Sequence, residues 1–148
     1  MPTIVWLHAG WMLLATAVGT WSGYLGLLRA LQRPGGKGPL PGRFNLKMHK
    51  WTGIAFYIML YVGLLGGVLM VRFWFGGKEP EGLWYWHERI AIAIGALYAG
   101  AAWVGLVLLK KPAGKARARP VAHMILNFTA CTLIAVQIVV ALRAIGWF

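Results

Sequence analysis

The sequence contains no aspartate, and only three of its 148 residues are acidic. A soluble protein covers its surface with many side chains of both charges, which a chain that is 59% hydrophobic with so few acids cannot supply. The single cysteine, Cys131, excludes a disulfide framework within the chain and a metal site built on paired cysteines. These shortages favour a protein whose surface faces lipid.

Four apolar runs are each close to the roughly 20 residues that a helix needs to cross a bilayer. They cover about residues 3–28, 49–71, 83–109 and 121–142, with segments rich in proline and glycine between them. No basic residue precedes the first run, so we expect a retained helix there rather than a cleaved signal peptide. Because the runs take up most of the chain, we predict one all-α domain, an antiparallel bundle of four transmembrane helices.

The 15 basic residues are divided unequally between the two faces of the predicted bundle. Eleven of them lie between spans one and two or between spans three and four, and the other four lie on the opposite face with all three glutamates. The positive-inside tendency places the richer face in the cytoplasm and both termini on the outer, periplasmic side of a bacterial inner membrane. Nucleic-acid binding is not expected, because it uses one continuous basic patch.

The chain has four histidines, and each falls in the first turn or two of a different span. Because the helices alternate in direction, His8 and His87 are predicted at similar depth near the outer surface, and His49 and His123 near the inner surface. Ionisable residues inside membrane spans are costly and usually functional. Neutral imidazole is a good axial ligand for haem iron, so each pair is a candidate site for one haem. The haems would be non-covalent, since the sequence has no C-x-x-C-H run.

Small residues share the helix faces that carry the histidines. Gly53 follows His49 by one turn, and Gly95 lies two turns after His87. A planar porphyrin needs thin helix surfaces of this kind, which makes both glycines candidate cofactor-binding residues. Small residues spaced by four are also the ordinary means of packing membrane helices, and that alternative stays open.

Polar side chains near the histidines are candidates for contact with the porphyrin edge. Lys47 and Lys50 near the inner pair, and Arg89 near the outer pair, are positioned to meet porphyrin propionates. Equally, they set the topology or bind anionic lipid. Asn127 and Gln137 in the last span are candidates to hydrogen-bond a neighbouring helix or a cofactor edge.

This placement of histidines resembles the four-helix core of the cytochrome b561 family, whose members carry electrons across membranes through two b-type haems. The resemblance implies that His8 and His87 ligate one haem and that His49 and His123 ligate the other. It covers nearly the whole chain and depends on histidine positions rather than on a distinctive motif. Eukaryotic members have additional flanking helices and basic residues associated with ascorbate use. We expect no flanking helices here, so ascorbate is not the expected donor.

Our first hypothesis is therefore a dihaem b-type cytochrome that exchanges electrons with quinone, a redox partner protein or a metal chelate, in a chain that is free to form oligomers. A haem-bearing membrane anchor subunit of a dehydrogenase is a related alternative. A cofactor-free transporter or proton-conducting bundle is the second hypothesis, although the nearly apolar centres of the spans disfavour a histidine relay. An enzyme acting at the membrane surface has few carboxylates to use, and a site with His87 and Glu88 stays open.

Overall fold

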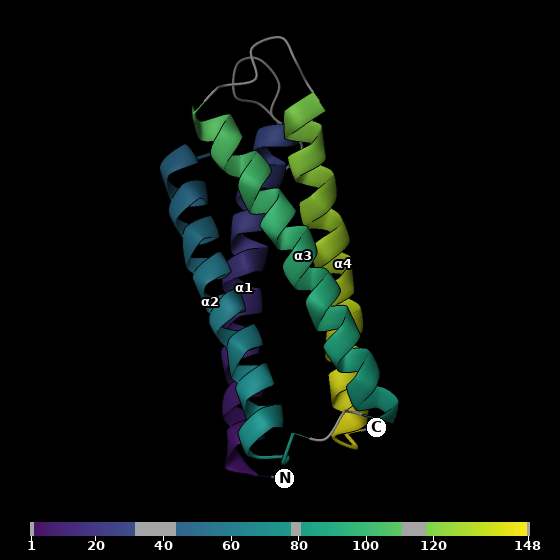
Figure 1. The fold of residues 1–148 in the computed structure, drawn as a ribbon. Helices are drawn as coiled ribbons and strands as arrows, with labels where there is room; N and C mark the ends of the chain where they lie inside the picture. The colour runs from purple at the N-terminus through teal and green to yellow at the C-terminus, as the bar shows by residue number, and fades with distance from the viewer. Residues whose placement is uncertain (1, 32–43, 78–80, 111–117, 148) are drawn as a thin grey trace.

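The computed structural model describes residues 2–31, 44–77, 81–110 and 118–147. These residues form the helices α1 (Thr3–Leu31), α2 (Leu46–Phe73), α3 (Gly82–Lys110) and α4 (Ala118–Ala144), shown in Figure 1. Each of the four is long and apolar enough to cross a membrane. The prediction of an all-α chain with four membrane-spanning helices is confirmed for the described residues.

Each helix extends one to three residues beyond its predicted span at one or both ends. The start of α2 shows why, because Asn45 caps this helix and its side chain accepts a hydrogen bond of 3.0 Å from the backbone N–H of Met48. Such a cap satisfies a backbone donor that has no partner within the helix. It lets the helix begin ahead of the apolar run, and Lys47 is therefore helical.

The four helices form two antiparallel hairpins. Figure 1 shows α1 lying along α2 and α3 lying along α4, and these two pairs make most of the contacts between helices. The hairpins meet through fewer contacts, between α2 and α3 and between α1 and α4. Within the described residues, α1 with α3 and α2 with α4 are the diagonal pairs of the bundle. The start of α1 and the end of α4 lie at the same end of the bundle.

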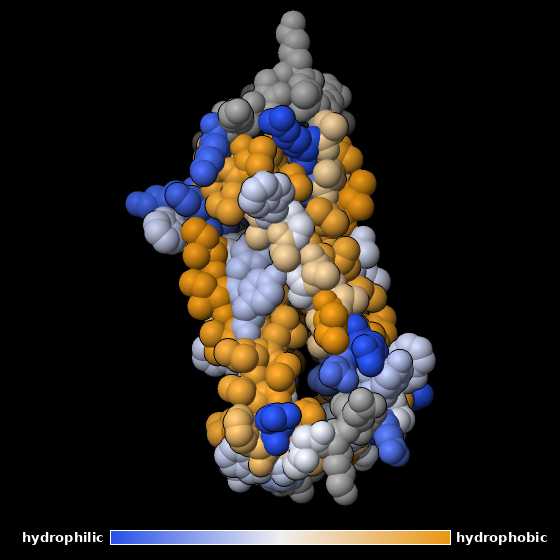
Figure 2. Space-filling view, in the orientation of Figure 1, coloured by the Kyte–Doolittle hydropathy of each residue, from blue (hydrophilic) through white to orange (hydrophobic). Residues whose placement is uncertain are grey.

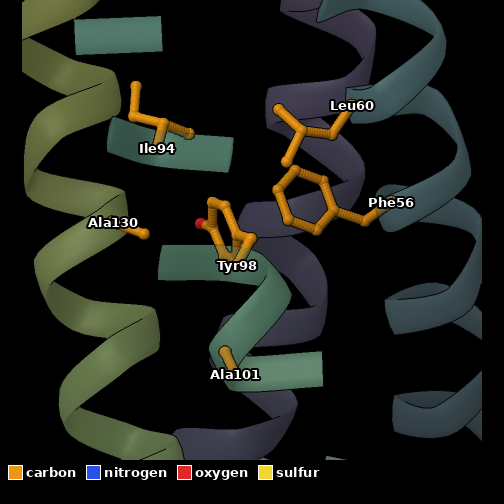
Figure 3. Close-up of a cluster of buried hydrophobic side chains, with 6 residues drawn as sticks. All are labelled: Phe56, Leu60, Ile94, Tyr98, Ala101 and Ala130. Atoms are coloured by element: carbon orange, nitrogen blue, oxygen red, sulfur yellow. The ribbon is translucent and has the colours of Figure 1, made fainter. Parts of the chain in front are cut away.

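The core lies halfway along the bundle, where the hairpins meet. Its six side chains come from α2, α3 and α4 and are drawn in Figure 3: Phe56, Leu60, Ile94, Tyr98, Ala101 and Ala130. The rings of Phe56 and Tyr98 face each other edge to face, with centroids 4.8 Å apart. The hydroxyl of Tyr61 donates a hydrogen bond of 2.9 Å to the Gly95 carbonyl, which joins α2 to α3. The middle of the bundle is therefore mainly apolar and aromatic.

The surface around the helices is suited to contact with lipid. Figure 2 shows hydrophobic side chains over most of the visible face, with hydrophilic residues gathered toward the two ends. Large apolar side chains such as Ile58, Leu65 and Trp103 are more than half exposed. Lipid tails are as apolar as these side chains, so a bilayer removes the cost that water would impose. The helices therefore have the surface of a multi-pass membrane protein.

Candidate functional site

The structure brings His49 of α2 and His123 of α4 together across the space between the hairpins. Their ring centroids are 6.5 Å apart and their planes are perpendicular. The two helices are diagonal in the bundle and make no direct packing contact in the described part of the chain. The two half-buried rings therefore approach each other where the backbones do not.

Both rings are held by the same kind of hydrogen bond. Nδ1 of His49 lies 3.0 Å from the Ser22 carbonyl oxygen in α1, and Nδ1 of His123 lies 2.9 Å from the Ala101 carbonyl oxygen in α3. A carbonyl oxygen only accepts, so each Nδ1 carries the proton and donates it. The lone pair of each ring is then on Nε2, the nitrogen that can bind a metal ion; at His123 this atom lies 3.4 Å from the Asn127 amide nitrogen.

Glycines of the neighbouring helices leave room for these rings. A Cβ atom placed on Gly26 would lie 3.3 Å from Cε1 of His49, and one placed on Gly105 would lie 3.1 Å from Cε1 of His123. Both distances are shorter than the usual carbon–carbon contact of about 3.5–4.0 Å. Each inner histidine is therefore fixed from one side by a carbonyl oxygen and packed against a backbone without a side chain.

The separation of the inner rings can be compared with that of two imidazoles bound to one metal ion. An imidazole nitrogen binds a metal ion at about 2.0 Å, and the ring centroid lies about 1.1 Å further back, so two opposed ligands have centroids about 6.2 Å apart. The observed separation of 6.5 Å is close to this value. Haem iron needs only two ligands from the protein, since the porphyrin supplies the other four. The described residues contain no cluster of three or more histidine, cysteine or acidic side chains, and a haem needs none.

The outer pair, His8 of α1 and His87 of α3, lies at the other end of the bundle. Both side chains are half-buried. Cε1 of His8 would lie 3.4 Å from a Cβ atom placed on Gly67 of α2. Fourteen residues separate His8 from Ser22 in α1, which corresponds to a rise of about 21 Å between the outer and inner levels.

The hydrogen bonding of the outer pair is incomplete. Nδ1 of His87 and Oε1 of Gln137 are both buried and have no hydrogen-bond partner. The amide nitrogen of the same Gln137 donates a hydrogen bond of 2.8 Å to the backbone carbonyl of His87. Gln137 thus contacts a neighbouring helix, as the sequence suggested, and it does so at the outer histidine.

Asn127 lies beside the inner pair but bonds within its own helix. Its amide nitrogen donates to the His123 carbonyl oxygen at 2.7 Å and lies 3.4 Å from Nε2 of the His123 ring. Neither contact joins α4 to another helix, which was one of the two predicted alternatives for Asn127. Asn127 is instead next to the atom of His123 that would bind a metal ion.

The predicted basic residues lie on the surface near the two pairs. Lys50 places its ammonium group 5.5 Å from the ring centroid of Trp51, and the Arg89 guanidinium lies 5.0 Å from the ring centroid of Tyr85. Lys47 is exposed in the first turn of α2. All three are accessible to an anionic group at the bundle surface, whether a propionate or a lipid phosphate.

Gly53 and Gly95 lie at contacts between helices rather than against the histidines. A Cβ atom on Gly53 would lie 3.4 Å from Oγ of Ser22, and one on Gly95 would lie 3.0 Å from Cδ1 of Leu64. The glycines that contact the histidines are Gly26, Gly67 and Gly105. Their signal in the sequence is a spacing of eighteen residues, since each follows a histidine of its own helix by five turns.

No family model matches the chain, and neither the curated proteins nor the solved structures give a match. The resemblance to the cytochrome b561 family therefore stays a prediction based on the positions of the histidines. Function has to be argued from the geometry of the site itself.

Proposed function

We propose that this protein is a membrane electron carrier that binds two b-type haems, one at His49 and His123 and the other at His8 and His87. The observation that carries the proposal is the geometry of the inner pair. The ring centroids of two imidazoles from different hairpins are 6.5 Å apart, and each ring donates Nδ1–H to a backbone carbonyl. Metal-binding histidines commonly donate the second ring N–H in this way, which fixes the tautomer and makes the ligand more basic.

The residues around the inner pair have two different roles. The carbonyls of Ser22 and Ala101 orient the inner rings, and Gly26 and Gly105 give them space. The core between the two levels keeps water out of the centre of the bundle. When bound, haem supplies a one-electron iron couple at each level. With the two levels about 21 Å apart, electrons would move along the membrane normal in steps.

The orientation and partners belong to the same proposal. We infer that the face carrying eleven basic residues lies in the cytoplasm and that both termini lie outside, in the inner membrane of a bacterium. Quinone or a redox protein, including a dehydrogenase that uses this chain as its membrane subunit, is the proposed class of partner.

A cofactor-free proton relay has less support. Such a relay needs a series of polar groups between the two histidine levels. The interval is filled instead by the buried side chains of Phe56, Leu60 and Ile94 together with the Tyr98 ring. Tyr98 and Tyr57, whose ring centroids are 5.8 Å apart, are phenols that remain protonated near neutral pH.

The decisive experiment is a haem assay combined with a spectrum of the reduced minus the oxidised protein. The chain is purified in detergent from bacterial membranes with haem synthesis supported. Two haems per chain with b-type bands are expected. A purified, folded protein without haem would overturn the proposal and favour the cofactor-free alternatives.

Single substitutions of the histidines test the pairing. His49→Ala and His123→Ala should each remove the same haem, and His8→Ala and His87→Ala should each remove the other. In every variant the remaining haem reports that the bundle is folded. Loss of both haems from each single variant, in protein that still purifies as folded, would contradict the assignment of two separate sites.

A further inference from the structure

The four helices share one internal pattern. A histidine is followed after fourteen residues by a position on nearly the same helix face, and after eighteen residues by a small residue. Eighteen residues are five turns, so these positions share one face of the helix. The members are His8, Ser22 and Gly26 in α1; His49, Gly63 and Gly67 in α2; His87, Ala101 and Gly105 in α3; and His123, Gln137 and Ala141 in α4.

At the inner level the pattern is complete. The histidine of one helix donates Nδ1–H to the carbonyl at the fourteenth position of its hairpin partner, which is Ser22 for His49 and Ala101 for His123. The same ring packs against the small residue at the eighteenth position. The two hairpins thus build the inner site by one rule, although they are different segments of the chain.

At the outer level the pattern holds only in part. The His8 ring packs against Gly67 at the eighteenth position of α2, but the hydrogen bonds of the described residues include none from this ring to the Gly63 carbonyl. By the same rule His87 should donate to the backbone of residue 137, but its Nδ1 has no partner. The residue there is Gln137, whereas the other three helices carry serine, glycine and alanine at the fourteenth position. Gln137 is therefore the one long polar side chain among the four, and it lies against the outer histidine.

The two unpartnered atoms at this point are complementary. In the tautomer that leaves Nε2 of His87 free for a metal ion, its Nδ1 carries the proton and is a donor. Oε1 of Gln137 is an acceptor, and both atoms are buried. Buried polar groups without partners are rare and call for an explanation. The amide nitrogen of Gln137 already donates a hydrogen bond of 2.8 Å to the His87 carbonyl oxygen. The whole amide group of Gln137 therefore lies beside His87. The terminal torsions of a glutamine side chain are soft, so its amide group reorients at little energetic cost.

We propose that Gln137 is the positioning residue of the outer site, and that its Oε1 accepts the Nδ1–H of His87 when the outer pair binds haem. The inner ligands are supported by backbone carbonyls, and His87 is supported by a side chain. The proposal rests on the proposed function. It makes the electronic properties of the outer haem dependent on residue 137, because an acceptor on Nδ1 increases the basicity of the ligand nitrogen.

Three variants separate this role from simple helix packing. Gln137→Leu removes the acceptor and the donor. Gln137→Glu keeps an acceptor but, when ionised, cannot donate to the His87 carbonyl. The control is Thr132→Val in the same helix, which removes a hydroxyl that bonds only to the Phe128 carbonyl. Each variant is purified with its haems, and haem content and the midpoint potential of each haem are measured at pH 8.

Gln137→Leu should weaken outer haem binding by 10- to 100-fold, the usual effect of losing such a support, and leave the inner haem unchanged. Gln137→Glu should retain the outer haem and lower its midpoint potential, because a carboxylate is a stronger acceptor than an amide. Thr132→Val should match the unsubstituted protein. In each variant, normal binding of the inner haem is the control that shows the bundle to be folded.

The outcomes that overturn the inference differ from those that overturn the function. If the unsubstituted chain binds no haem, the proposed function fails. If it binds two haems and Gln137→Leu alters neither the content nor the potential of the outer one, Gln137 does not position His87. If Gln137→Glu loses the outer haem as Gln137→Leu does, the amide N–H is the group that matters, and the assigned acceptor role is wrong.

Discussion

Replacing Gly105 by alanine tests whether the inner site depends on the space beside His123. The added Cβ would lie 3.1 Å from Cε1 of the ring, where carbon atoms normally approach to about 3.5–4.0 Å. The ring or the spacing of α3 and α4 must therefore shift by about 0.5 Å. Metal–ligand distances hold within about 0.2 Å, so this shift exceeds what a ligand bond tolerates. We expect Gly105→Ala to lower inner haem affinity by about tenfold or more, and Gly105→Val to abolish it.

The assay is titration of the haem-free protein with haem, followed by the absorbance of each site, with His123→Ala used to identify the inner signal. Gly100→Ala is the matched control, because it is in the same helix and its Cβ would lie at an ordinary 3.6 Å from Cδ1 of Leu126. The control should bind both haems normally. If Gly105→Ala also binds the inner haem with unchanged affinity and spectrum, the assignment of Gly105 as the space for His123 is refuted.

Three further changes probe the bundle, each measured by detergent unfolding of the haem-free protein. Gly19→Ala should destabilise it by about 1–3 kcal/mol, because the new Cβ would lie 2.7 Å from the Phe56 ring; a variant as stable as Gly66→Ala, where the Cβ meets nothing within 4 Å, would contradict this packing. Tyr61→Phe should lower the free energy of unfolding by about 0.6 kcal/mol, because the hydrogen bond to the Gly95 carbonyl of α3 is lost. An unchanged free energy of unfolding would show that this hydrogen bond does not stabilise the bundle. Asn45→Ala should lower the free energy of unfolding by about 1 kcal/mol, because α2 loses its N-cap. An unchanged free energy of unfolding would show that the side chain of Asn45 does not cap α2.

The helices were predictable because membrane spans have a simple requirement. A run of about 20 apolar residues forms a helix in lipid, since its backbone groups find partners only within the segment. The ends were less predictable, because they depend on local bonds rather than on hydropathy. Asn45 starts α2 ahead of the apolar run, and Gly76 and Gly77, both with positive φ, follow its end.

The site was predictable only in part. Alternating helix direction places His49 and His123 at one depth, and the structure brings their rings together. Which glycine faces which ring depends on how the helices are rotated, and rotation is set by the packing of many side chains. The sequence therefore points to Gly53 and Gly95, whereas the structure places Gly26 and Gly105 against the inner rings. The carbonyls that accept from Nδ1 leave no mark in the sequence, because every residue has one.

The sparse contact between the two hairpins has a consequence for assembly. Each proposed haem takes one ligand from each hairpin, so its binding energy also holds the two halves together. If the proposed haems bind, haem binding therefore strengthens the association of the two helix pairs in the bilayer. Under the same proposal, the haem-free chain relies on its sparse contacts between hairpins alone, and a chain that opens more often is more exposed to membrane proteases.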